Sequence, residues 1–116
     1  MLLQGGQFEN GESDKKLKEL ILYICLKEEG DENFGLTKLN KILFKADFLA
    51  YRYWGKPMTG QDYFKLENGP APRRMVPVTE MMKQCDELFI RLTPHYGYPQ
   101  KRPIAKREPD LSLFTG

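Results

Sequence analysis

Few residues in this sequence carry side chains that could do chemistry, and they form no catalytic pattern. The single histidine, His95, lies in the turn-like stretch TPHYGYP, and neither Cys25 nor Cys85 has metal-ligand spacing. Asp47 is the most unusual carboxylate, because helical periodicity places it at the edge of an apolar face. Acid–base catalysis there would need a second acid, a histidine or a metal nearby. We therefore expect no catalytic residue, no metal, no cofactor and no enzymatic activity.

The alternative for Asp47 is structural. A half-buried carboxylate needs hydrogen-bond or ionic partners, because burial makes its charged form costly. A tyrosine or an arginine from the extended segment that follows would be a suitable partner. We take this as the prediction for Asp47, with the catalytic role as the competing one.

Length and composition predict one soluble globular domain. The chain has 116 residues, of which 41% are hydrophobic and 29% charged. Its formal net charge of +2 is too small to indicate nucleic-acid binding. No apolar run approaches the length of a membrane span, and the two cysteines are expected to be buried and reduced. These features favour a cytoplasmic protein with no membrane partner.

Glycines and prolines divide the chain into elements that could position these residues. Residues 1–12 are expected to be a flexible N-terminal arm, followed by a helix that Ser13 caps and Gly30 ends. A second helix should begin with Thr37 as its cap and end at Trp54.

The remaining segments predict a mixed fold. Residues 58–69 are expected to be extended, and residues 73–88 to form a third helix with Pro77 in its first turn. From residue 88 onward, closely spaced prolines and extended stretches favour a β-hairpin or ribbon. The predicted fold class is α+β, a mainly helical single domain with a short extended segment or β-hairpin.

The second helix has three predicted surfaces. One is an apolar face expected to join the core: Leu39, Ile42, Leu43, Ala46, Leu49, Ala50, Tyr53 and Trp54. The opposite side carries a basic stripe: Lys38, Lys41, Lys45 and Arg52. Phe44, Phe48 and Tyr51 lie on the flank between them. The stripe is either a solvated face or a contact surface for acidic or phosphate groups; as a contact surface it would include Phe48, an exposed aromatic beside it.

A second binding mode involves the basic C-terminal ribbon. Five basic residues and no acidic one lie between residues 88 and 107: Arg91, Lys101, Arg102, Lys106 and Arg107. Basic residues interleaved with tyrosines can follow a phosphate backbone and stack on bases. We therefore keep a nucleic-acid-associated protein as the alternative function.

A series of short motifs over residues 36–73 resembles a known family. The motifs are Lys38-Leu39-Asn40-Lys41-Ile42-Leu43-Phe44, Ala46-Asp47, Gly55-Lys56-Pro57, Thr59-Gly60, Tyr63 and Gly69-Pro70-Ala71-Pro72. In order and spacing they resemble the Panacea domain, the SocA-like antitoxin family, over about a third of the chain.

The resemblance implies a mostly helical cytoplasmic domain of bacteria and their phages and prophages. Such domains resemble the antitoxin half of toxin–antitoxin systems, which neutralises a cognate toxin by direct protein binding. It also implies a structural junction in which the Gly69, Pro70 and Pro72 turn locks the extended segment against the second helix. Asp47 and Tyr63 would be partners across this junction.

The chain departs from the family after the stretch DLSLF, where relatives continue into one or two further helices. We therefore expect residues 13–116 to be a Panacea-like domain that lacks its C-terminal helices. An apolar surface left uncovered in this way would favour pairing with a second copy as a homodimer.

Overall fold

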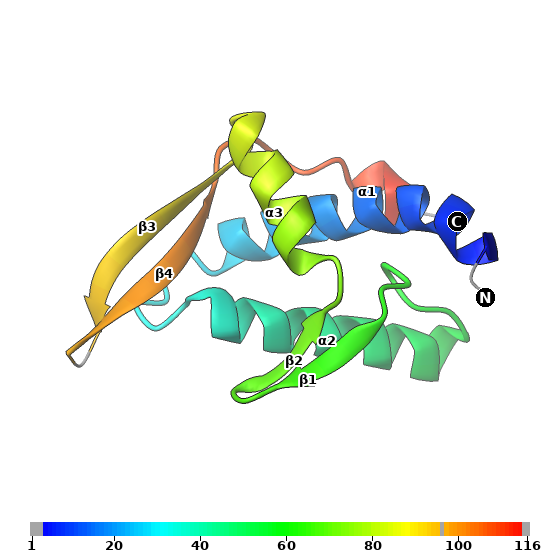
Figure 1. Cartoon of the computed structure of the whole chain (residues 1–116), viewed down its shortest axis with the longest axis horizontal. Helices are drawn as coiled ribbons and strands as arrows, with labels where there is room; N and C mark the ends of the chain where they lie inside the picture. Colours follow the sequence, from blue (N-terminus) through cyan, green and yellow to red (C-terminus); the bar gives the residue numbers. More distant parts are fainter. Residues whose placement is uncertain (1–3, 96, 115–116) are drawn as a thin grey trace.

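The computed structural model describes residues 4–95 and 97–114. Its elements are α1 (Gln4–Lys27), α2 (Leu36–Trp54), β1 (Tyr63–Leu66), β2 (Gly69–Pro72), α3 (Met75–Gln84), β3 (Leu88–His95), β4 (Tyr98–Ala105) and the short 3₁₀ helix η1 (Leu111–Phe114). In Figure 1, α1 and α2 lie side by side, the β1–β2 hairpin lies along α2, and the β3–β4 hairpin projects from one end. The α+β prediction is confirmed.

The hydrophobic core lies between α1, α2 and α3. Buried side chains of α1 such as Leu17 and Ile21 meet Leu39 and Leu43 of α2 and Met82 of α3. All five of these side chains are fully enclosed. The buried face of α1 therefore packs against both other helices.

The predicted helix starts are wrong. Residues 4–12, expected to be an arm, are helical, because no proline interrupts them and a formed helix extends readily. Ser13 therefore does not cap α1; its Oγ instead accepts a hydrogen bond of 2.8 Å from Gln61 Nε2. Residues 1–3 lie outside the described part of the chain. Gly35, not Thr37, is the N-cap of α2, and it provides no side-chain cap.

The apolar face of α2 is buried only in its first part. Leu39, Leu43 and Ala50 are buried as predicted, but Tyr53 is 71% and Trp54 75% exposed. Leu49 and the aromatic side chains of the last turn extend beyond the buried cluster, which is centred on the first half of the helix. Gly55 ends α2 in the left-handed conformation, with φ of 80°.

The two hairpins are antiparallel and separate from each other. Tyr63 pairs with Pro72 in the first, and Leu88 pairs with Ala105 in the second, at the end that packs against the core. The predicted extended segment and C-terminal hairpin are thus confirmed. Cys25 is buried, which raises the pKa of its thiol to about 12. Cys85 is exposed, contrary to expectation, because it follows the last residue of α3 and points away from the core.

Candidate protein-binding site

Asp47 is the polar centre of the junction between α2 and the segment that follows it. Its side chain is only 6% exposed. Its Oδ1 accepts the backbone N–H of Thr59 at 2.7 Å, and its Oδ2 accepts the hydroxyls of Thr59 and Tyr63, the latter at 2.7 Å. These three hydrogen bonds satisfy the buried carboxyl oxygens. The contact expected between Asp47 and Tyr63 is therefore present.

The Tyr63 hydroxyl donates a hydrogen bond to Asp47 in this junction. Burial raises its pKa well above the ordinary value, and the negative charge of Asp47 and the hydrogen bond to it act in the same direction. Gln61 links the same segment to α1 through Ser13 and, at 3.3 Å, Asp14. The junction thus fixes the start of β1 against both long helices.

The turn between β1 and β2 requires a glycine. Gly69 has a φ of 128°, which side-chain-bearing residues rarely adopt, and an added Cβ would lie 3.2 Å from Cε of Lys41. After it, Pro70 is partly buried, and Ala71 and Pro72 are buried against α2. These residues pack the hairpin against α2, while Phe64, Lys65 and Leu66 of β1 stay exposed.

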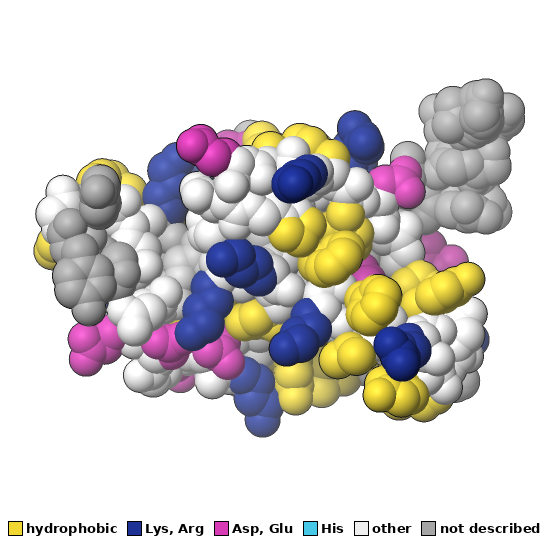
Figure 2. All heavy atoms as spheres, turned by 90° about the horizontal axis from the view of Figure 1, so that it is seen from below, with side chains coloured by type: hydrophobic (Ala, Val, Ile, Leu, Met, Phe, Trp, Pro, Cys, Tyr) yellow, Lys and Arg dark blue, Asp and Glu magenta, His cyan; other side chains and the backbone are white. Residues whose placement is uncertain are grey.

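Exposed aromatic side chains lie on α2 and on β1. The Phe44 and Phe48 rings stack with centroids 6.3 Å apart, and Phe44 meets the edge of Tyr63 at 5.2 Å. Phe48 is 51% exposed and Phe64 38%. The guanidinium of Arg73 lies over the Phe64 ring, 5.3 Å from its centroid. Hydrophobic side chains can be seen among lysines and arginines on the molecule's lower face (Figure 2).

All the residues predicted to bind a partner are exposed, but they are not equivalent. Lys38 forms an ion pair with Asp31, so its charge already has a partner within the fold. Lys41 lies beside the Gly69 turn. Lys45 and Arg52 are exposed on α2 near Phe48. We define the α2–hairpin face as Phe44, Lys45, Phe48, Arg52, Phe64 and Arg73.

Sequence reasoning missed three members of this face. Phe44 precedes Phe48 by one helical turn on the same flank, so its role could have been inferred from spacing. Phe64 and Arg73 lie on different segments, and only the β1–β2 pairing, continued by the hydrogen bond from Arg73 N to Asp62 O at 2.7 Å, brings them together. No local pattern could have identified that pair.

The basic C-terminal ribbon is largely occupied by internal contacts. Arg102 donates four hydrogen bonds to main-chain carbonyls around the α1–α2 loop, the shortest 2.6 Å, to Asp31 O. Lys106 pairs with Asp86. Arg107 forms a two-pronged ion pair with buried Glu19, at 2.9 and 2.7 Å. Three of its five basic side chains therefore stabilise the fold, which weakens the case for a phosphate-binding ribbon.

Two kinds of site are absent from the described ranges, 4–95 and 97–114. They contain no group of three or more histidine, cysteine, aspartate or glutamate side chains arranged to hold a metal ion. Within the same ranges, no helix has the length and apolar character needed to cross a bilayer.

The chain is thus a small α+β domain with an exposed surface of aromatic and basic side chains. The family model "Antitoxin SocA-like, Panacea domain" matches residues 39–96, which is half of the chain. The chain belongs to this family. The match begins in α2 and extends through α3 into the second hairpin, beyond the motifs that indicated it. Comparison with curated proteins and with solved structures gave no match.

Proposed function

We propose that this protein is an antitoxin-type module that neutralises a cognate toxin by direct contact, without catalysis. Membership of the SocA-like family supports an antitoxin-type role in general. The observation that carries the specific proposal is the α2–hairpin face, on which Phe48 stacks on Phe44 and yet stays half exposed. Aromatic residues and arginines carry much of the binding energy in protein interfaces.

The composition of this face supports an acidic partner surface with an apolar pocket. Its charged members are Lys45, Arg52 and Arg73, and all are exposed. Phe44 and Phe48 stack into one apolar ridge beside them. An acidic toxin surface would be steered by the charges and held by the aromatics.

The setting we propose is the cytoplasm of a bacterium, with the gene carried by a phage or prophage. Both cysteines are unpaired, which suits a reducing compartment. We also propose a homodimer formed through the exposed last turn of α2 around Tyr53, which is 71% exposed.

The test is rescue of cells that express the product of the neighbouring gene. We expect the double variant Phe48→Ala/Arg52→Ala to keep its melting temperature but to lose both rescue and co-purification of that product. A matched control is Phe89→Ala/Arg91→Ala on β3, because Phe89 is 50% exposed and Arg91 is likewise exposed. This control should rescue normally.

Three outcomes would contradict the proposal. Full rescue by Phe48→Ala/Arg52→Ala would remove the α2–hairpin face from the interface. Tight, salt-sensitive binding to random duplex DNA with no captured protein would favour the nucleic-acid alternative instead. Turnover in a broad substrate screen that is lost in Asp47→Asn would show that the protein is an enzyme.

A further inference from the structure

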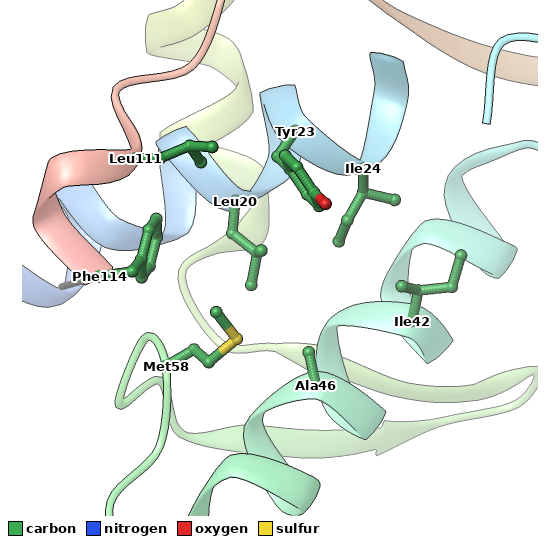
Figure 3. Close-up of a pocket in the computed structure, with 8 residues that line it drawn as sticks. All are labelled: Leu20, Tyr23, Ile24, Ile42, Ala46, Met58, Leu111 and Phe114. Carbon is green, nitrogen blue, oxygen red and sulfur yellow. The ribbon is translucent and has the colours of Figure 1, made fainter. Parts of the chain in front are cut away.

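An apolar groove runs between α1 and α2, away from the α2–hairpin face. It contains two adjoining hollows of about 430 Å³ each, and both are lined in part by Met58 and Phe114. Figure 3 shows the side chains of α1, α2, η1 and the loop after α2 converging on the first hollow: Leu20, Tyr23, Ile24, Ile42, Ala46, Met58, Leu111 and Phe114. The second hollow continues past Ala50 to exposed Trp54.

The short helix η1 shows which kind of side chain packs in this groove. Leu111 and Phe114 of η1 both line the first hollow, and they are three residues apart in a helical turn. Leu113 lines the second hollow together with Phe114. Apolar side chains at helical spacing therefore fit against one wall of the groove. The two hollows leave space for further apolar side chains. This is the pattern of helix-in-groove recognition.

The charges at the groove favour an acidic occupant. Lys16 and Lys56 line the second hollow, and none of the described residues that line either hollow is acidic. Lys16 has one partner, Glu12, at 3.5 Å, but the Glu12 side chain is 74% exposed and the pair is screened by water. A helix with glutamates or aspartates beside its apolar row would meet complementary charge here.

A second copy of the chain fits these charges poorly. The exposed apolar pairs at helical spacing on α2, Phe44 with Phe48 and Leu49 with Tyr53, lie among Lys45, Arg52 and Lys56. Inserting that surface would bring like charges together at the groove rim, which is unfavourable at an interface.

We propose that the groove between α1 and α2 is a docking site for an acidic amphipathic helix of another protein. Ile42 and Ala46 of the groove lie about 200° around α2 from Phe44 and Phe48, at 100° per residue. The groove and the α2–hairpin face are therefore separate surfaces that can be altered independently. The inference does not depend on the partner being a toxin.

The probe is a labelled, stapled helical peptide of about 15 residues, with leucines at i, i+3, i+4 and i+7 and glutamates between them. We expect saturable binding by fluorescence anisotropy. Ala46→Phe, which fills the first hollow, and Lys16→Glu/Lys56→Glu, which reverses the rim charge, should each weaken binding by about tenfold or more. Lys45→Glu/Arg52→Glu, on the α2–hairpin face, is the matched charge-reversal control and should bind normally.

A second peptide, with lysines in place of the glutamates, tests the charge requirement. It should bind weakly to the wild type and more tightly to Lys16→Glu/Lys56→Glu. No binding of the acidic peptide, equal binding of both peptides, or equal loss in Lys45→Glu/Arg52→Glu would each overturn the proposal. So would a dimer in sedimentation that Ala46→Phe dissociates, since the groove would then belong to a second copy. Circular dichroism melts establish that each variant is folded.

Discussion

Replacing Asp47 with alanine should destabilise the fold substantially. The carboxylate accepts the N–H and the hydroxyl of Thr59 and the hydroxyl of Tyr63, and Thr59 is only 3% exposed. Alanine leaves two buried Thr59 donors unpaired, at about 1–3 kcal/mol each before relaxation. Tyr63 is less buried and can recover a water partner. We therefore expect the free energy of unfolding to fall by about 2–4 kcal/mol.

Urea denaturation followed by circular dichroism measures this change. Tyr63→Phe removes one donor and leaves the carboxylate with two, so it should cost only about 1 kcal/mol. Lys45→Ala, an exposed change on the same helix, should cost less than about 0.5 kcal/mol. If Asp47→Ala were as harmless as Lys45→Ala, the carboxylate would be solvated and the junction would not hold the hairpin.

Three further perturbations test the scaffold. Burial favours a raised pKa at Glu19, but hydrogen bonds from Arg107 and from a backbone amide outweigh this effect and lower the pKa. The contribution of Glu19 to stability is therefore present above about pH 4.5 and is lost as the pH falls through the pKa that Glu19 has in the folded state. Glu19→Gln should flatten the acid limb of the stability–pH curve. Arg102→Ala should cost about 2–3 kcal/mol in urea melts, and Arg102→Lys should recover less than half because an ammonium cannot reproduce the fork. Gly69→Ala should lower stability by about 1–2 kcal/mol through its positive φ and its contact with Lys41, whereas Lys41→Ala should not.

The local periodicities of the chain were enough to predict the element types. Apolar spacing predicted the buried face of the first half of α2, and the end of α2 at Trp54 was also predicted. The start of α1 was misplaced because a capping residue such as Ser13 can equally serve inside a helix, where its hydroxyl binds a distant partner. The exposure of Trp54 was missed because periodicity gives the direction of a side chain but not whether another element covers it.

The sequence alone was enough to predict the turns, most of the helical extent and the exposed basic stripe, because these depend on backbone preferences and on residues within one or two turns. Which charges remain available to a partner follows from the tertiary packing. Arg102 and Arg107 look like free cations in the chain, yet folding brings them to the carbonyls after α1 and to buried Glu19. The pairing of Phe64 with Arg73 and the groove under η1 likewise join segments far apart in sequence. Such contacts depend on chain packing, which no local pattern of residues encodes.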